Sequence, residues 1–455
     1  MKKASSAEKT ASKPKPATAA PAGGEDDDLV ERLTGIAGRI VKNMVASLEV
    51  PTATSVRTLP AKLLDENRRI VNEHMKVRAL GKASFTHFIA YAIVKALSEV
   101  PRAQSAFFIQ DEKPHKRVPA HVNIGLAIDV PGADGSRNLV VPNIKHAETM
   151  NFAEFHAAYE DIVERGRNGK LEGKDFQGTT VTLTNPGGFG TVMSVPRLMP
   201  GQGVIIATGS IGVPPEAQGM SAARLADVAL GKVMTMTSTY DHRVIQGAES
   251  GLLLKRVDEL LQGAEGFYDE IFHVMRIPWT PARFAADARA QSERDAGEMQ
   301  AKLWKLITAY RTRGCMLADL DPLEYSPNLL PSLDPQNYGF TIWDLDRMFL
   351  GDPLWGTRLM SLREILTVLR RAYCRRWTTE YMHIQNHERK QWIRERIEKP
   401  ENEIEFDADD RRRILTNLMH AEKFERFLHT RYVGNKRFSL EGADTLIPAL
   451  RDLIE

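Results

Sequence analysis

A histidine in a short polar segment is the residue of this sequence best suited to chemistry. The segment reads Tyr240-Asp241-His242-Arg243-Val244-Ile245-Gln246-Gly247 and lies between a run typical of a strand and a run typical of a helix. An imidazole has an ordinary pKa of about 6.5, so it can accept a proton near neutral pH. The alternative is a structural histidine whose ring donates to a neighbouring carbonyl.

A second polar segment follows another predicted strand. Thr180, Thr182 and Thr184 alternate along one face of that strand, and the run Thr184-Asn185-Pro186-Gly187-Gly188-Phe189-Gly190 comes after it. A positioned hydroxyl can donate to a developing oxyanion, and the loss of one such donor typically raises a barrier by about 3 kcal/mol. The alternative is an ordinary strand threonine before a glycine-rich turn.

An α/β core is predicted to position both segments. Apolar and polar residues alternate strictly over 122–130, and further strands are expected at 180–184, 204–209 and 233–240. After Ser84, a plausible helix cap, apolar residues recur at three- and four-residue spacing, which predicts an amphipathic helix. A closing helix over 248–261 should bury one face, made of Leu253, Val257, Leu260 and Leu261.

Composition restricts the classes of partner. The chain has 455 residues, with 61 basic against 59 acidic side chains, and this net charge of +2 gives no indication of a nucleic-acid or membrane partner. Cys315 and Cys374 are too few for a disulfide framework, and no apolar run is long enough to span a bilayer. We therefore expect a cytoplasmic protein.

The chain divides by composition into four parts. Residues 1–28 are rich in Ala, Pro, Lys and Ser and predict a disordered tail or linker. Residues 29–272 form the α/β domain, 273–296 a linker, and 297–455 a mostly α-helical region. In that region an apolar stripe over 299–310 predicts a helix ending at Gly314, and further helices are expected at 361–373, 388–398 and 409–428.

The histidine segment resembles the His-x-x-x-Asp-Gly signature of the dihydrolipoamide acyltransferase and chloramphenicol acetyltransferase superfamily, and the resemblance extends over residues 49–272. It implies a chloramphenicol acetyltransferase-like two-layer α/β domain in which His242 deprotonates the attacking thiol of a dihydrolipoyl group or of coenzyme A. Thr184 matches the hydroxyl that donates to the oxyanion. The resemblance further implies a trimer with each site between two subunits, and it assigns no metal ligand. The neighbours expected to support the site are Asp241, Arg243, Asn185 and Gly247.

One position departs from the signature. Gln246 stands where the family has aspartate, and the resemblance makes it the third expected catalytic residue beside His242 and Thr184. An amide can form hydrogen bonds there but cannot supply a charge. Two alternatives to an active acyltransferase therefore stay open. The domain could be a catalytically weak trimeric scaffold, or it could be an antibiotic-modifying acetyltransferase of the same superfamily.

The helical region resembles the amino-terminal part of the 2-oxoglutarate dehydrogenase decarboxylating component. The matching segments are Ala309-Tyr310-Arg311-Thr312-Arg313-Gly314, Ala318-Asp319-Leu320-Asp321-Pro322-Leu323, Glu380-Tyr381-Met382-His383-Ile384 and Lys436-Arg437-Phe438-Ser439-Leu440-Glu441-Gly442. Together the two halves imply a succinyltransferase fused to a decarboxylase. Arg311 and Arg313 could be functional or solvated helix charges, and Cys315 is assigned no function. His383 and His429 are ambiguous between packing and substrate contact.

The resemblance also implies cofactors and partners. The decarboxylase family holds thiamine diphosphate through Mg²⁺ at a Gly-Asp-Gly segment, which is missing here, and Ala133-Asp134-Gly135 is a chance match. We therefore expect a truncated decarboxylase part, inactive by itself. The sequence has no Asp-Lys-Ala lipoylation site, so a separate lipoyl-carrying acyltransferase and dihydrolipoamide dehydrogenase are the expected partners. Residues that contact coenzyme A are not assigned; Lys82, His87 and Lys95 either border the active site or form a solvated face.

Overall fold

The computed structural model describes residues 32–131, 137–287, 293–321, 329–355, 359–399, 406–436, 438–440 and 442–454. These residues group into two compact units, neither of which is continuous in sequence. Unit 1 contains the described residues within Met1–Leu59, Thr86–Gly212 and Met234–Leu261, and unit 2 those within Pro60–Phe85, Val213–Val233 and Gln262–Glu455. The predicted tail at 1–28 and the chance match at 133–135 lie outside the described residues. The linker predicted at 273–296 stays a prediction, because a division into compact units does not show which part of the chain folds independently.

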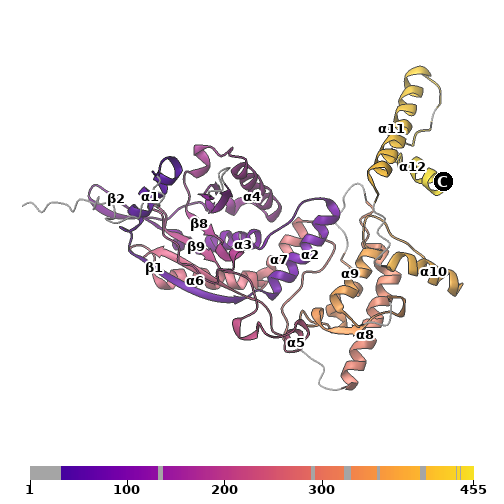
Figure 1. Cartoon of the computed structure of the whole chain (residues 1–455), viewed down its shortest axis with the longest axis horizontal. Helices are drawn as coiled ribbons and strands as arrows, with labels where there is room; N and C mark the ends of the chain where they lie inside the picture. Colours follow the sequence, from indigo (N-terminus) through magenta and orange to yellow (C-terminus); the bar gives the residue numbers. More distant parts are fainter. Residues whose placement is uncertain are drawn as a thin grey trace, which may run out of the picture. The chain divides into compact units, whose positions relative to one another are not determined.

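Unit 1 is built on a six-stranded mixed sheet, part of which is visible in Figure 1. The strands in spatial order are β1 (Thr52–Pro60), β10 (Val233–Asp241), β9 (Val204–Thr208), β8 (Val181–Thr184), β4 (Ile124–Leu126) and β7 (Asn143–Ile144). Strand β8 is parallel to β9 and β4, whereas β10 is antiparallel to β9. All five residues of β9 are buried, as expected for a central strand.

The strand predicted over 122–130 is wrong in one respect. The chain leaves the main sheet after Leu126, and β5 (Ile128–Pro131) pairs with β6 (Arg137–Val140) in a separate hairpin. A second hairpin joins β2 (Ala106–Gln110) to β3 (Lys113–Arg117). Alternation indicates which face of a strand is apolar, but it carries no information on which strand becomes the partner.

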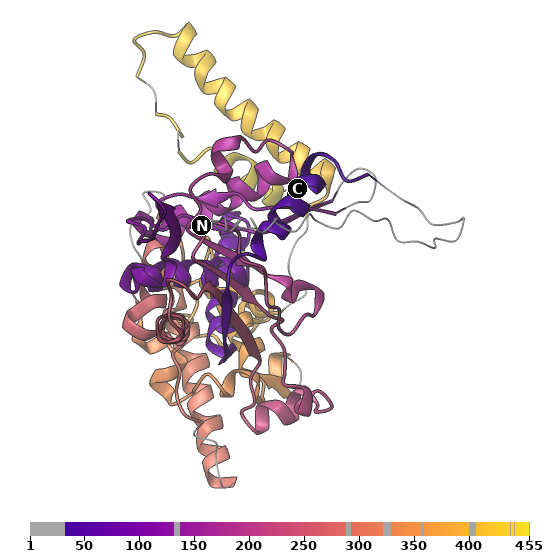
Figure 2. The ribbon, with the colours of Figure 1, turned by 90° about the vertical axis from the view of Figure 1, so that its left-hand side faces the viewer.

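The described helices of unit 1 are α1 (Gly35–Ser47), α3 (Phe85–Glu99), α4 (Phe152–Arg167) and α6 (Gly247–Leu261). Of these, α3 and α6 were predicted from their apolar pattern, whereas α1 and α4 were not. The four apolar residues predicted for the buried face of α6 are each at most 4% exposed. Asn151 caps the start of α4: its side chain accepts from the backbone N–H of Glu154, while the Glu154 carboxylate accepts from the backbone N–H of Asn151. Figures 1 and 2 show α3 and α6 beside the strands of the sheet.

Unit 2 is mostly helical. Its helices are α2 (Lys62–Arg78), α5 (Ala222–Asp227), α7 (Phe267–Val274), α8 (Glu293–Arg313), α9 (Leu362–Tyr373), α10 (His387–Glu398), α11 (Ala408–Arg431) and α12 (Leu446–Ile454), and a small hairpin joins β11 (Met348–Leu350) to β12 (Leu359–Ser361). Helix α8 ends at Arg313 as predicted. A Cβ at Gly314 would lie 2.6 Å from the Cβ of Tyr373, so close packing against α9 requires glycine there. Figure 2 shows α11 as one uninterrupted helix.

A buried charge network joins two of the decarboxylase-like segments within unit 2. The Arg311 guanidinium donates to both carboxylate oxygens of Glu398 at 2.7 Å and to Asp352 at 2.7 Å. Glu398 is fully buried and also accepts from the Tyr373 hydroxyl at 2.6 Å, which in turn contacts the hydroxyl of Tyr381. Burial opposes the charge, yet the two carboxylates raise the pKa of Arg311. The interpretation of Arg311 as a solvated helix charge is therefore wrong.

The predicted fold class is confirmed. A mixed α/β unit carries the histidine and threonine segments, and a mostly helical region follows it in sequence. Among the residues that the structure describes, no helix has the length and apolar character needed to cross a membrane.

Candidate active site

His242 stands in a tight turn directly after β10. The buried carboxylate of Asp241 accepts from the backbone N–H of Arg243 at 3.0 Å and from its guanidinium at 2.9 and 2.7 Å. This pairing raises the pKa of Arg243, whose guanidinium also lies 3.9 Å from the centre of the Phe107 ring. Val244 and Ile245 are buried behind the turn, which leaves the His242 side chain exposed. Asp241 and Arg243 thus hold the turn in place rather than contact the imidazole.

The His242 ring is oriented by the main chain. Its Nδ1 lies 3.2 Å from the carbonyl oxygen of Ile245, and its backbone N–H donates to Pro51 at 3.0 Å. A carbonyl oxygen only accepts, so this hydrogen bond requires the proton on Nδ1 and leaves Nε2 with a free lone pair. The contact proposed for a structural histidine therefore also prepares the ring to act as a base.

Gln246 and Gly247 form the junction between the histidine turn and α6. The backbone N–H of Gln246 donates to the Glu249 carboxylate at 2.8 Å, while the Gln246 side chain is exposed. A Cβ at Gly247 would lie 3.4 Å from the hydroxyl of Tyr240, an ordinary van der Waals distance, so the helix begins next to that ring without requiring glycine for space. The described contacts of Gln246 are thus those of a helix start.

Thr184 is the last residue of β8 and is half-buried. The Asn185 side chain accepts from the backbone of Gly187 at 3.1 Å and donates to the Thr86 hydroxyl at 2.9 Å. A Cβ at Gly187 would lie 2.4 Å from the backbone of Gly209, so only glycine fits this approach. These contacts fix the turn that follows Thr184 and tie it to the start of α3.

The two halves of the predicted site lie at opposite ends of the sheet within one chain. Thr184 is in register with Ala207 on β9, which is in register with Thr237 on β10. His242 comes five residues after Thr237, about 17 Å further along at roughly 3.4 Å per residue. The structure therefore groups His242 with Asp241, Arg243 and Gly247 but does not bring His242 and Thr184 together.

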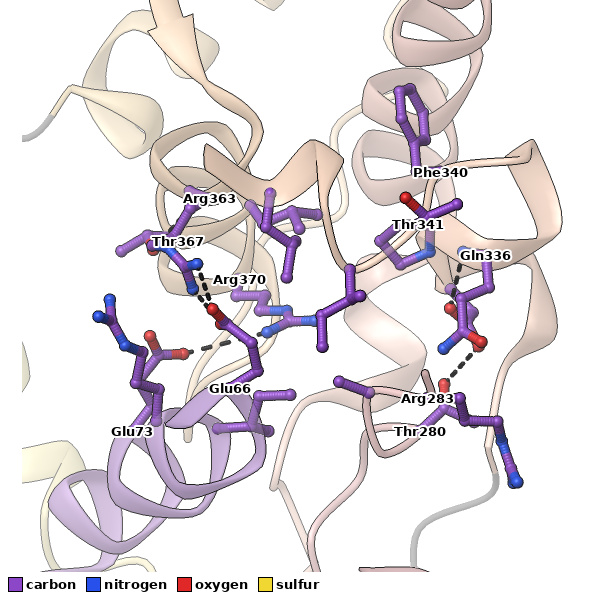
Figure 3. Close-up of a pocket in the computed structure, with 18 residues that line it drawn as sticks. Glu66, Glu73, Thr280, Arg283, Gln336, Phe340, Thr341, Arg363, Thr367 and Arg370 are labelled. Atoms are coloured by element: carbon purple, nitrogen blue, oxygen red, sulfur yellow. Dashed lines mark hydrogen bonds and ion pairs between the residues drawn. The ribbon is translucent and has the colours of Figure 1, made fainter. Parts of the chain in front are cut away.

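A pocket in unit 2 contains neither of these residues. Figure 3 shows that its charged lining is paired: Arg363 donates to Glu66, and Arg370 lies 4.0 Å from Glu73. On the other side Thr280 donates to Asp334 at 2.7 Å. Charges already compensated by one another offer little to a charged substrate. We therefore place the candidate chemistry at the ends of β8 and β10 in unit 1.

Sequence reasoning overlooked one group of side chains. His87, mentioned only as a residue near the expected site, lies next to His156 and Glu160. The signal available in the sequence was His156 and Glu160 four residues apart in a segment with helical periodicity, since this spacing puts both on one face of a helix.

The fold and site define a mixed α/β domain that presents an exposed histidine directly after an inner strand of its sheet. Consistent with this class, residues 25–268 match the family described as 2-oxoacid dehydrogenases acyltransferase (catalytic domain). This match covers more than half of the chain, and the chain belongs to this family.

Two curated relatives resemble nearly the whole chain. The "Multifunctional 2-oxoglutarate metabolism enzyme" of Mycolicibacterium vanbaalenii is 50% identical over 441 residues, which is 96% of this chain and 35% of the relative. The "2-oxoglutarate dehydrogenase E1/E2 component" of Corynebacterium glutamicum is 48% identical over 93% of this chain and 34% of the relative. The chain thus spans about a third of the length of these relatives.

One solved structure is similar to about half of this chain. A probable dihydrolipoamide acetyltransferase from Listeria monocytogenes is 26% identical with a TM-score of 0.45, covering 52% of this chain and 94% of that structure.

Proposed function

We propose that this chain transfers a succinyl group between a dihydrolipoyl thiol and coenzyme A, with His242 as the general base. The observation that supports this most directly is the contact between His242 Nδ1 and the Ile245 carbonyl, which leaves Nε2 able to take a proton. Family membership supports the reaction class.

The reaction needs no bond to the protein. His242 Nε2 takes the proton of the incoming thiol, and the sulfur forms a bond to the thioester carbonyl carbon. The carbonyl oxygen becomes an oxyanion that accepts a hydrogen bond from the Thr184 hydroxyl. When the tetrahedral intermediate collapses, the bond to the first sulfur breaks, and the departing thiolate takes the proton back from His242. The same steps run in either direction.

We propose that each site joins His242 of one copy to Thr184 of another copy in a trimer. The separation of these residues along the sheet supports this assignment, because one chain cannot place the hydroxyl and the imidazole on the same carbonyl. A run of exposed apolar side chains beside Thr184 also favours a contact with another copy; its members are Phe189, Val192, Met193 and Val195. The supporting roles of Asp241, Arg243 and Asn185 would then be to hold the two turns.

The names of the relatives support the choice of succinyl and the setting of 2-oxoglutarate oxidation. By the same similarity, residues 29–272 would be the acyltransferase domain and 297–455 the first part of a decarboxylase domain. A longer protein with a thiamine diphosphate and Mg²⁺ site could then perform decarboxylation. A separate lipoyl-carrying acyltransferase and dihydrolipoamide dehydrogenase would complete the oxidation.

A subunit-mixing experiment tests the shared site. His242→Ala and Thr184→Ala proteins are each expected to be nearly inactive in thioester exchange between succinyl-CoA and free dihydrolipoamide. If the two variants are co-expressed in equal amounts and assemble at random, about one quarter of the sites in a cyclic trimer should combine an intact histidine with an intact threonine.

The control is co-expression of His242→Ala with a His242→Ala, Thr184→Ala double variant, which contains no intact histidine. Activity in the first mixture and none in the control supports a site shared between copies. If the mass of the mixed assembly confirms heterotrimers but activity does not rise above that of either parent, the shared site is wrong.

The second candidate function is a trimeric scaffold with little turnover. It is favoured by Gln246, whose exposed amide replaces the family's carboxylate. The scaffold function is supported if the wild-type trimer shows no measurable thioester exchange while a Gln246→Asp trimer exchanges readily.

A further inference from the structure

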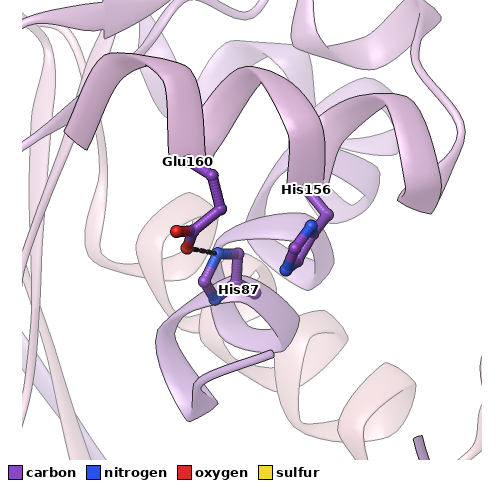
Figure 4. Close-up of side chains that lie close together, drawn as sticks. All are labelled: His87, His156 and Glu160. Carbon is purple, nitrogen blue, oxygen red and sulfur yellow. Dashed lines mark ion pairs between the residues drawn. The ribbon is translucent and has the colours of Figure 1, made fainter. Parts of the chain in front are cut away.

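Two histidines and a glutamate gather where α3 and α4 pack together (Figure 4). His87 Nε2 lies 2.9 Å from a carboxylate oxygen of Glu160, and the rings of His87 and His156 are stacked with centres 4.6 Å apart. One potential ligand atom from each residue lies within 4.8 Å of those of the other two. None of these residues has a part in the proposed acyl transfer.

The backbone holds the three side chains in this arrangement. His156 and Glu160 are four residues apart on α4 and therefore project from one face, toward His87 on α3. Aromatic contacts next to the cluster fix the two helices, with Phe88 5.0 Å and Tyr91 5.4 Å from the Phe152 ring. The ligand set is thus carried by a packed helix pair rather than by loops.

The three side chains of the cluster differ in their exposure to solvent. His87 is 2% exposed and His156 9%, whereas the Glu160 side chain is 53% exposed. The ring of Tyr159 covers His87 from another side, with centres 4.0 Å apart. An ion bound here would therefore lie between nearly buried imidazoles and remain open to water beside Glu160.

We propose that His87, His156 and Glu160 bind a divalent transition-metal ion such as Zn²⁺. Two imidazole nitrogens and one carboxylate oxygen are a ligand set that zinc accepts, with water in the fourth position. In a tetrahedral zinc site the donor atoms lie about 3.3 Å apart, as bond lengths near 2.0–2.1 Å require. Binding would therefore draw the donor atoms, which lie within 4.8 Å of one another, closer together by rotation of the side chains. Mg²⁺ and Ca²⁺ prefer oxygen ligands and should bind poorly.

A second cluster in unit 1 has the same residue types but a different setting. His121 and His146 are exposed, and both oxygens of Glu148 already accept hydrogen bonds, one from His121 Nδ1 at 2.7 Å and one from the backbone of Val122 at 2.9 Å. These bonds lower the pKa of Glu148, although burial opposes the shift. A metal at the proposed site would have to displace the single contact between His87 and Glu160, whereas a metal at this cluster would have to displace the His121 contact and compete with the backbone hydrogen bond from Val122. The second cluster therefore serves as a matched control.

Metal binding to the full chain, prepared without a polyhistidine tag and stripped with EDTA, tests the proposal. Equilibrium dialysis against ZnCl₂ followed by metal analysis should find one ion per chain that is absent from Glu160→Gln and His156→Gln at the same free zinc concentration. Losing a ligand should weaken binding by more than the roughly 10–100-fold typical of losing a residue that only supports one. A His121→Gln, His146→Gln double variant should bind like wild type.

Co²⁺ substitution provides an independent readout. Strong visible bands in the wild type, lost in Glu160→Gln, are expected for a four-coordinate site. Circular dichroism of the metal-free variants checks that each is folded, and Glu160→Gln keeps the test valid if a histidine variant fails to fold, because that side chain is half-exposed. Binding that is unchanged in both the Glu160 and His156 variants, or lost only in the His121, His146 variant, would overturn the proposal. So would an absence of zinc binding by the wild type.

Discussion

The polar residues of the histidine turn and those around Arg311 are arranged in opposite ways. At the turn, His242 is exposed and its ring has one described hydrogen bond, to a main-chain carbonyl. Around Arg311, both carboxylate partners, Asp352 and Glu398, are buried, and Glu398 accepts from three side chains, one of them Trp355 at 3.0 Å. The arrangement at the turn leaves the lone pair of His242 Nε2 available to a substrate, whereas the hydrogen bonds to Glu398 occupy both of its carboxylate oxygens.

This difference distinguishes a region suited to catalysis from a region that stabilises the fold. A reactive imidazole must be oriented without being saturated, so its removal should cost activity and little folding energy. A buried ion pair is saturated, and removal of one partner leaves an uncompensated charge in the interior. The two regions therefore predict opposite responses to substitution.

The largest expected effect is on turnover. His242→Ala should reduce thioester exchange by about 10²–10⁴-fold, the usual contribution of a general base, while the urea midpoint stays unchanged. His115→Ala is the matched control, since His115 is also exposed and its Nδ1 lies 2.9 Å from a main-chain carbonyl oxygen. Equal activity losses in both variants, or a large loss of stability in the His242 variant, would contradict the view that the histidine turn serves catalysis and not stability.

Substitution in the buried network around Arg311 should reduce stability and leave activity unchanged. Glu398→Ala is expected to lower the free energy of unfolding by about 3–5 kcal/mol, because Arg311 loses its main partner in the interior. Urea unfolding measures this change, with Glu388→Ala on the exposed start of the same helix as control. Thioester exchange by the folded fraction should stay at the wild-type level. A change below about 1 kcal/mol would contradict the role assigned to the network.

A smaller effect is expected from pH. Burial, reinforced by the charge of Arg78, lowers the pKa of His74 to about 4. Above pH 6.5 the His74 side chain is neutral in both the folded and the unfolded state. As the pH falls from 6.5 to about 4, the side chain becomes protonated in the unfolded chain but stays neutral in the folded chain, so the free energy of unfolding decreases.

The difference corresponds to about 3 kcal/mol at most, at 1.36 kcal/mol per unit of pKa. Urea midpoints should therefore fall less steeply over this range in His74→Gln than in the wild type. Parallel curves for the two proteins would show that His74 does not titrate in this way.

The smallest effect is expected at the helix start beside the histidine. Gln246→Asp places a better cap before α6 and should stabilise the protein by up to about 1 kcal/mol. Exchange activity should change by less than about tenfold, because the described contacts of Gln246 are with α6 and not with the imidazole. A much larger gain in exchange, measured beside the urea midpoint, would mean that the amide limits catalysis.

Much of the architecture could be predicted from local pattern. The apolar face of α6 and the helix end before Gly314 agree with the prediction, because both depend on residues close in sequence. The division of 122–130 into two strands did not follow from the pattern, since the partner of β5 lies on a separate segment. The turn holding His242 was predicted as a strand end, but its ring orientation required the position of Ile245.

The sequence by itself determined several of the strands and helices, among them α3, α6 and α8, and the presence of one histidine turn, since periodicity and short motifs are set by neighbours along the chain. Tertiary structure decided which polar groups become buried partners: Arg311 with Glu398, 87 residues apart, and His87 with Glu160. It also decided that Thr184 and His242 lie at opposite ends of one sheet. The physical reason is that burial and pairing depend on which distant surfaces pack together, and no local pattern specifies that choice.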